Sequence, residues 1–277
     1  MKNLILLFIS AAIFFFSCAS STKIPKLNDD EIFFVDYFGD EQIQKIDPNV
    51  KKCTLNKKLF KRKKYKMLYK DDSYIVRQGV DISRHDGIVN WLELKNAGFD
   101  FVILRCAYRG YQTGILHVDE HFYNNLHGAL LAGFDVGVYV FSQAINEEEA
   151  LEEADLVLQL IKGYNITLPV VFDPENVGWE WARTDEISGE QFTKNTIVFC
   201  EKVKNAGYTP MIYSNLTWQT MRLDLSQLAQ YKMWYADYHK IPETPYHFEY
   251  WQHYSPMKVP GVKKPCDVNI MIKKREN

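Results

Sequence analysis

Two carboxylates one residue apart, Asp173 and Glu175, end a short apolar stretch, Leu168–Phe172, that is rich in β-branched and aromatic residues. In a strand the side chains alternate between faces, so both acids project to the same side, with alpha carbons roughly 6.5–7 Å apart. Two neighbouring acids repel each other, which raises the pKa of one of them. A carboxyl group that stays protonated beside a charged partner can act as a general acid. The alternative is that both acids only cap the following loop or helix, and the pair alone does not decide between the two.

The elements around this pair alternate regularly between strands and helices from about residue 74 onward. Strands are expected near 74–83, 99–108, 136–142, 168–173, 209–214, 232–236, 249–253 and 268–272, and helices near 88–98, 119–133, 146–163 and 188–207. This order predicts an α/β fold with a parallel-strand core. No Gly-rich phosphate loop follows the first strand, which argues against a dinucleotide-binding fold. Between 233 and 252 the helices shrink or vanish, so we expect a distorted or incomplete (β/α) TIM-like barrel.

In such barrels the functional side chains lie at the C-terminal ends of the strands. That rule brings four acids to one mouth: Asp81 from the first strand, Asp173 and Glu175 from the fourth, and Asp267 before the last. Seven further strand-end residues are candidate substrate contacts: Tyr139, Phe141, Tyr213, Trp234, Asp237, Trp251 and Gln252. Aromatic rings can stack on sugar faces while acids act on the glycosidic bond, so this set predicts a carbohydrate site. For most of the aromatic residues, which make up 14% of the chain, the plain alternative is that they fill the core.

Several short motifs carry a family resemblance: Gly79-Val-Asp-Ile-Ser, Gly137-Val-Tyr-Val-Phe, Asp173-x-Glu175, Trp251-Gln and Asp267-Val-Asn269. Their order and spacing resemble the family 25 glycoside hydrolases, the Chalaropsis-type lysozymes, over about residues 78–275. The resemblance implies a distorted α/β barrel and cleavage of the β-1,4 bond between N-acetylmuramic acid and N-acetylglucosamine in peptidoglycan. It implies Glu175 as the general acid, with the other three acids accompanying it in the cleft.

The resemblance also implies that Tyr139, Tyr213 and Trp234 contact sugars, while Phe141 departs from the family, whose members often carry His there.

Two acids at positions i and i+2 reach the same side of a sugar more easily than opposite sides. We therefore expect the substrate's 2-acetamido oxygen to attack the anomeric carbon while Asp173 orients the acetamido group. The alternative is direct inversion by a water molecule that Asp81 or Asp267 holds. The distance between the catalytic carboxyl groups does not decide between the two, because substrate-assisted enzymes are exceptions to the rule that links this distance to the stereochemical outcome.

Two other functions remain in competition. One is hydrolysis of another N-acetylated glycan such as chitin, and the other is a non-catalytic wall-binding lipoprotein, which would keep the aromatic residues and lack the acids. A metal-dependent deacetylase would need a His-rich site at the strand ends, and the sequence shows none. We expect no metal and no cofactor. Cys53, Cys106, Cys200 and Cys266 have no metal-ligand spacing, and nothing in the sequence decides whether any pair is oxidised.

The N-terminus has the pattern of an export signal. Residues 1–17 hold a positive start and a short apolar segment, and Phe15-Phe16-Ser17-Cys18 resembles a lipoprotein cleavage box, with Phe16 where a small residue is common. Lipidation of Cys18 would make the protein an exported, membrane-anchored lipoprotein of the cell envelope.

The charge distribution separates the chain into two parts. Residues 19–77 hold 14 Lys and Arg against 9 Asp and Glu, whereas the remainder from residue 79 has 18 against 26. We interpret residues 18–77 as a basic linker or tether, with one small folded or docking element at most, and 78–277 as the catalytic barrel. Nucleic acid is a poor partner for an exported acidic domain. We expect the peptidoglycan glycan strand to be the partner, and the protein to be a monomer.

Overall fold

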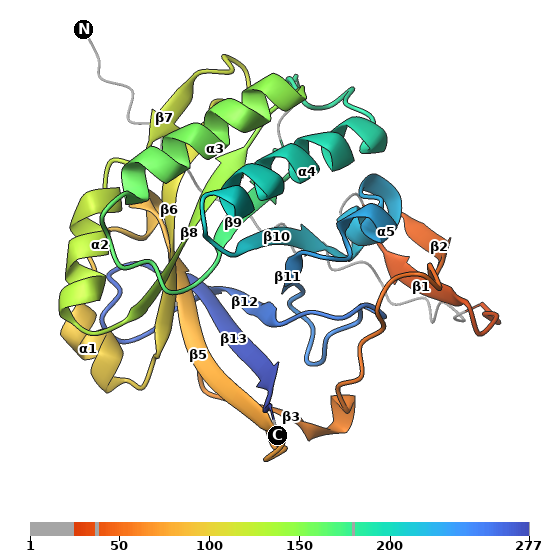
Figure 1. Cartoon of the computed structure of the whole chain (residues 1–277). Coiled ribbons are helices and arrows are strands. Elements are labelled where there is room, and N and C mark those ends of the chain that lie inside the picture. The colour runs from red at the N-terminus through yellow and green to blue at the C-terminus, as the bar shows by residue number, and fades with distance from the viewer. Residues whose placement is uncertain (1–24, 37–38, 179–180, 277) are drawn as a thin grey trace, which may run out of the picture.

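The computed structural model describes residues 25–36, 39–178 and 181–276, and eight strands in it close into a barrel (Figure 1). The barrel strands are β5 (Tyr74–Ile82), β6 (Phe101–Arg109), β8 (Asp135–Ser142), β9 (Val170–Pro174), β10 (Pro210–Asn215), β11 (Lys232–Ala236), β12 (Tyr250–Met257) and β13 (Cys266–Lys274). From β5 to β12 each barrel strand runs parallel to the next. The expected TIM-like barrel with a parallel core is confirmed.

The last strand departs from this pattern, because β13 is antiparallel to both of its neighbours, β12 and β5. Only residues 258–265 separate β12 from β13, which is too short for the helical crossover that a parallel connection needs. The reversal places the start of β13 at the mouth where the other strands end. As a result Asp267 pairs directly with Asp81.

Four helices cover the outside of the barrel: α1 (Trp91–Asn96), α2 (Phe122–Leu131), α3 (Glu147–Ile161) and α4 (Gly189–Asn205) (Figure 1). Asn146 begins α3 by accepting a hydrogen bond from the Glu149 backbone N–H at 2.9 Å, as N-cap residues do. After β10 only a short π-helical turn, η3 (Trp218–Arg222), and α5 (Leu225–Leu228) follow, and no helix joins β11 to β12. The predicted loss of helices in this part of the barrel is confirmed.

The barrel interior shows why one motif glycine is required. A Cβ at Gly79 would lie 2.2 Å from Cε2 of Phe101, closer than packed atoms can approach. Phe101 and its neighbours fill the middle of the barrel with apolar side chains, among them Ile103, Val171 and Tyr250. The four candidate acids lie beyond this apolar layer, toward the C-terminal ends of the parallel strands.

The N-terminal part of the described chain is folded, which differs from the expected linker. It forms two antiparallel hairpins, β1 (Glu31–Val35) with β2 (Glu41–Lys45) and β3 (Phe60–Lys63) with β4 (Lys66–Tyr69), the second preceded by the 3-10 turn η1 (Lys57–Leu59). Phe34, Leu55, Met67 and Tyr69 pack in one buried cluster with Tyr235, Phe248 and Trp251 of the barrel. The barrel itself begins at Tyr74, and a short strand, β7 (Leu116–Val118), adds to the edge of β6.

The expected signal segment and Cys18 lie outside the described residues. Within the part that the structure describes, no helix has the length and apolar character needed to cross a membrane. Cys106 and Cys200 are buried free thiols, as the apolar context of each predicts, and Cys53 and Cys266 are free as well.

Candidate active site

All four predicted acids lie at the C-terminal mouth of the barrel. Asp81 and Asp173 are each the last residue but one of their strands, β5 and β9, both at inward-facing positions, and they are only 7% and 4% exposed. Glu175 follows β9 directly and is half-buried, and Asp267 reaches the same mouth from the start of β13. The rule that strand ends carry the functional side chains therefore holds for this group.

Gln252, on β12, connects the acids to two tyrosines. Its Nε2 donates to Oδ2 of Asp81 at 3.0 Å and to Oδ2 of Asp267 at 3.4 Å. Its Oε1 accepts from the hydroxyl groups of Tyr213 at 2.9 Å and Tyr238 at 2.8 Å. Both ends of the amide are thus occupied, and Gln252 holds these four side chains in a fixed arrangement.

Asn269 forms a second bridge, from β13. Its Nδ2 donates to Oδ2 of Asp81 at 2.7 Å, and its Oδ1 accepts from Nε1 of Trp234 at 2.8 Å. Trp234 is buried and packs edge-on against Tyr213, with ring centroids 4.8 Å apart. Trp234 therefore forms the floor of the site.

Neither Asn269 nor Tyr238 was among the predicted site residues. The strand period could have found Asn269, because it lies two residues after Asp267 and so faces the same side. Tyr238 belongs to the loop after β11, where no periodic pattern locates a side chain.

Burial raises the pKa of every acid in the group. Burial and then the charge of Asp267 raise the pKa of Asp81, and burial and then the charge of Glu175 raise that of Asp173. Burial raises the pKa of Glu175 to about 7, although hydrogen bonds with Asp173 and Tyr213 act in the opposite direction. The pKa of Asp267 is also raised to about 7, chiefly by burial. The site therefore holds protons at neutral pH.

One oxygen of this group has no assigned partner. Within the described residues, Oδ1 of Asp173 is buried and has no hydrogen-bond partner. A buried carboxylate oxygen without a donor is unfavourable, which favours a proton shared between the Asp173 and Glu175 carboxyl groups and raises the pKa of Asp173. The charge of Arg105, whose Nε donates to Oδ2 of Asp119 at 2.8 Å, lowers the pKa of Asp173 and acts against these effects.

The predicted substrate contacts divide into those that reach the mouth and those that do not. Tyr139 is half-buried in the barrel interior beside Trp234, and Phe141 lies next to Asp173 in the strand register. Trp251 does not reach the mouth. It is fully buried on the outer face of β12 and packs against Phe60, with ring centroids 5.2 Å apart. Adjacent strand residues face opposite sides, so the inward position of Gln252 forces Trp251 outward.

Asp237 reaches the mouth, but its carboxylate is used to shape a loop. Its oxygens accept hydrogen bonds from Tyr235 Oη at 2.9 Å and from the backbone N–H groups of His239 at 2.9 Å and Glu243 at 2.8 Å. In the described part of the chain, Asp237, His239 and Glu243 are the one group whose ligand atoms lie close enough to hold a metal ion. Because Asp237 already accepts these bonds, the hydrogen bonds within the loop are enough to explain why the three side chains lie close together.

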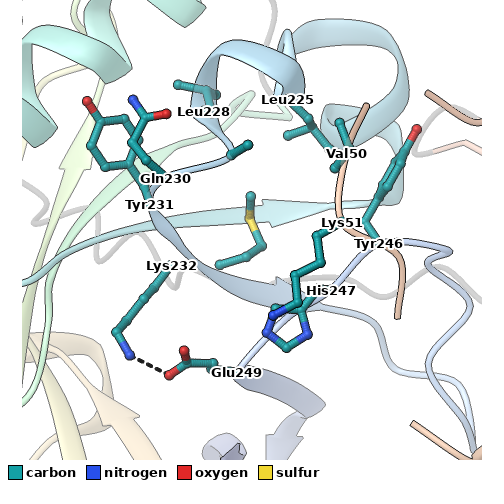
Figure 2. Close-up of a pocket in the computed structure, with 12 residues that line it drawn as sticks. Val50, Lys51, Leu225, Leu228, Gln230, Tyr231, Lys232, Tyr246, His247 and Glu249 are labelled. Atoms are coloured by element: carbon teal, nitrogen blue, oxygen red, sulfur yellow. Dashed lines mark hydrogen bonds and ion pairs between the residues drawn. The ribbon is translucent and has the colours of Figure 1, made fainter. Parts of the chain in front are cut away.

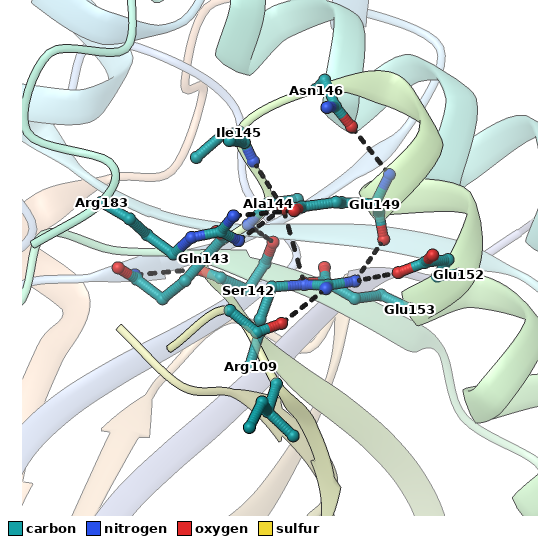
Figure 3. A network of polar contacts seen from close by, with 12 residues as sticks. Arg109, Ser142, Gln143, Ala144, Ile145, Asn146, Glu149, Glu152, Glu153 and Arg183 are labelled. Carbon is teal, nitrogen blue, oxygen red and sulfur yellow. Dashed lines mark hydrogen bonds and ion pairs between the residues drawn. The ribbon is translucent and has the colours of Figure 1, made fainter. Parts of the chain in front are cut away.

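A second network, of which Figure 3 shows Gln143, Glu149 and Arg183, fixes the backbone that carries Glu175. Gln143 Nε2 donates to the Glu175 carbonyl oxygen at 2.7 Å, and its Oε1 accepts from the hydroxyl of Thr184 at 2.9 Å. Arg183 forms a two-pronged ion pair with Glu149 at 2.5 and 2.7 Å, which ties the loop after β9 to α3. These contacts hold the loop from both of its ends.

The nearby buried pair Arg109 and Glu153 completes this network, with Nε and Oε1 2.7 Å apart. Neither residue was predicted to have a role. Arg109 shares its strand with Arg105, and Glu153 lies among the acidic residues of 147–155, so the sequence did not mark either of them.

Two cavities can be compared as locations for the active site. One, of about 260 Å³, is lined by Glu175, Tyr213 and Tyr238 and opens beside the acids. Another, of about 310 Å³, lies between α5, β11 and the segment carrying Val50 and Lys51 (Figure 2). The Lys232–Glu249 ion pair of 2.5 Å lines this second cavity at the start of β11, so it lies at the opposite end of the barrel from the acids. The first cavity is therefore the candidate active site.

A TIM-like barrel with buried acids and tyrosines at its mouth is the architecture of a barrel glycoside hydrolase. The chain belongs to the glycosyl hydrolases family 25, whose family model matches residues 80–262. Lysozyme M1 of Streptomyces globisporus is 31% identical over 102 residues, which cover 36% of this chain and 33% of that protein. A probable family 25 lysozyme of Dictyostelium discoideum is 27% identical over 198 residues, covering 68% of this chain and 83% of that protein.

Solved structures share the fold. The bacterial lysozyme of Streptomyces coelicolor superposes with a TM-score of 0.58 at 25% identity, covering 70% of this chain and 90% of that one. The modular autolysin LytC of Streptococcus pneumoniae, in complex with a synthetic peptidoglycan ligand, superposes with a TM-score of 0.60 at 23% identity. That match covers 88% of this chain and 57% of the autolysin, so this chain spans little more than half of it.

Proposed function

We propose that the protein is a peptidoglycan hydrolase, a lysozyme that cleaves the β-1,4 bond between N-acetylmuramic acid and N-acetylglucosamine. The observation that carries this proposal is the neighbouring pair Asp173 and Glu175 at the C-terminal end of β9, where burial raises the pKa of both carboxyl groups, that of Glu175 to about 7. Family membership supports the reaction class, and the peptidoglycan ligand bound by the autolysin supports the choice of substrate.

In the proposed mechanism, Glu175 donates its proton to the glycosidic oxygen as the bond from that oxygen to the anomeric carbon breaks. The oxygen of the substrate's 2-acetamido group attacks the same carbon and forms a cyclic oxazolinium intermediate. The Asp173 carboxylate accepts a hydrogen bond from the acetamido N–H and stabilises the positive charge. Water then opens the ring, giving its proton to Glu175 and restoring the original anomeric configuration.

Asp81 and Asp267, held by Gln252 and Asn269, maintain the negative potential of the cleft in this scheme. In the alternative scheme one of the two holds a water molecule that attacks directly and inverts the anomeric carbon. NMR of the first products distinguishes the schemes, because net inversion excludes participation of the acetamido group.

The decisive variant is Glu175→Gln, which removes the acid and keeps the shape of the side chain. Loss of the general acid should lower peptidoglycan hydrolysis by about 10²–10⁴-fold, with an unchanged circular dichroism spectrum and melting temperature. Near-normal hydrolysis by this variant would exclude Glu175 from the acid role. Release of muropeptides, identified by mass spectrometry, checks the bond that is cleaved.

The second candidate substrate is another N-acetylated glycan such as chitin, because the acetamido chemistry would be the same. A panel of dye-labelled peptidoglycan and chitin separates the two candidates by their relative kcat/KM values. A non-catalytic wall-binding protein is less consistent with this site, since all four acids are present and their pKa values are raised.

For localisation, we propose an exported monomer anchored to a membrane through acyl chains on Cys18. The cleavage box in the sequence supports this proposal. Cys18→Ser should abolish incorporation of labelled fatty acid and release the protein from the membrane fraction. If Cys18→Ser still incorporated the fatty acid and stayed in the membrane fraction, the proposed anchor would be wrong.

A further inference from the structure

The segment that the sequence presents as a linker contributes directly to the cleft that holds Glu175. The cavity beside Glu175 and Tyr213 is also lined by Phe34, Val35 and Asp36 at the end of β1. In Figure 1 the β1–β2 hairpin projects beside α5, on the same side as β10 and β11. Residues 31–45 lie outside the 80–262 range matched by the family model, so this wall is not part of the matched family region.

We propose that the β1–β2 hairpin is an outer wall of the substrate cleft and contacts sugar units of the glycan strand beyond the two at the scissile bond. This inference rests on the proposed function, since the occupant is the peptidoglycan glycan itself. A linear polymer must leave the catalytic centre through the groove that is continuous with it, and the cavity from Glu175 to β1 is such a groove.

The hairpin is held firmly enough to form part of a binding site. Phe34, on the inner face of β1, is buried in the cluster with Leu216 and Tyr235, the latter from β11. The backbone N–H of Ile46 donates to the Asp30 carbonyl at 2.7 Å and closes the base of the hairpin. Such contacts fix the wall before a ligand arrives, which reduces the entropy lost on binding.

The opposite wall has the chemistry of a sugar contact. The Tyr238 ring is half exposed, while its hydroxyl is held by Gln252 at 2.8 Å, so a flat apolar surface is presented in a fixed orientation. On the hairpin, Val35 is 58% exposed and adds apolar surface at the rim. Asn215 and Thr217 line the cavity between these walls and supply polar groups for sugar hydroxyls.

The rest of the N-terminal segment braces the loop that carries Tyr238. Lys57 Nζ donates to the Glu243 carbonyl at 3.3 Å, and Arg62 Nη2 donates to the His239 carbonyl at 3.4 Å. The backbone N–H of His247 also donates to the Lys51 carbonyl at 2.8 Å. The N-terminal segment thus forms one wall of the groove through β1, and it also supports the loop with Tyr238 that forms the opposite wall.

Chain-length kinetics test the proposal with two matched variants. Val35→Glu places a charge at the rim of the groove, and Leu131→Glu places the same charge at the end of α2, at a residue that is 89% exposed and does not line the cavity. For Val35→Glu, kcat/KM on a peptidoglycan octasaccharide should fall about tenfold, and on a tetrasaccharide by less than about twofold. Leu131→Glu should match the wild type on both substrates.

Hydrogen–deuterium exchange gives a measurement that does not require turnover. The octasaccharide, bound to the Glu175→Gln variant, should slow exchange in the peptide spanning residues 31–36 and leave the peptide spanning 60–69, in the β3–β4 hairpin, unchanged. The proposal requires both results: unslowed exchange in 31–36, or a Val35→Glu variant with the wild-type chain-length profile, overturns it. If the wild type cleaves neither oligosaccharide, the proposed function fails, and exchange in 31–36 still decides whether the hairpin contacts the glycan.

Discussion

At the scale of single residues, the proton on Glu175 sets the pH range in which the site can work. Burial raises its pKa to about 7, well above that of an exposed glutamic acid. A general acid acts in its protonated form, so the active fraction is complete at mildly acidic pH and declines as pH rises through this value.

We therefore expect kcat/KM on soluble peptidoglycan fragments to fall about tenfold for each pH unit above roughly 7. A rate profile from pH 4 to 9 at constant ionic strength measures this, with circular dichroism at each pH as the control for folding. Activity that increases between pH 7 and 9 would contradict the role of Glu175 as the acid.

The positions of single residues in their strands also explain which site residues could be predicted from the sequence. Asp81, Asp173 and Glu175 follow apolar strands directly, so their presence at the mouth follows from strand period and barrel topology. The sequence offered both Trp251 and Gln252, although only one of two adjacent strand residues can face inward. Choosing between them needs the exact register of β12, which a short apolar run does not determine.

At the scale of elements, the loop after β9 decides how accurately Glu175 is oriented. Gln143, which is buried just after β8, links the Glu175 carbonyl to Thr184 on the far side of that loop. A displacement of the acid by a fraction of an ångström weakens proton transfer without removing any catalytic group.

Gln143→Ala should therefore lower kcat by roughly 10–100-fold while KM changes little. Gln191→Ala is the matched control, because that half-buried glutamine bonds Glu147 and Asn195 away from the acid. Steady-state kinetics on the same substrate compare the two. An equal fall in kcat for both variants would mean that the effect is general destabilisation rather than positioning.

Long periodic elements such as α3 and α4 were predicted nearly to their ends, because caps and apolar spacing agree there. The direction of β13 was not predicted, since it depends on the short connection after β12 rather than on the strand's own residues. The hairpins β1–β2 and β3–β4 were missed for a different reason. The less exposed positions of β2 and β3 include Gln42, Gln44 and Arg62, so the alternation of apolar and polar residues that marks a strand is absent from their sequences.

At the scale of the whole molecule, the N-terminal segment and the barrel share a core, which a flexible tether would not. Met67, on β4, is fully buried in the cluster that includes Tyr235, Phe248 and Trp251 of the barrel. The Gln78 side chain of β5 also donates to the Met67 carbonyl at 2.8 Å. The two parts should consequently unfold together.

Met67→Ala tests this directly, because it removes buried atoms between the two parts and leaves the active site untouched. We expect the free energy of unfolding to fall by about 2–5 kcal/mol, the range for truncating a buried methionine, with a single cooperative transition in urea. Lys63→Ala, on the exposed side of β3, should change it by less than about 0.5 kcal/mol. An unchanged stability in Met67→Ala, or a separate early transition in the wild type, would mean that the segment is a dispensable attachment. A single unfolding transition would show that the N-terminal segment and the barrel form one cooperative unit. The β1–β2 hairpin would then keep its position relative to Glu175 as long as the barrel is folded.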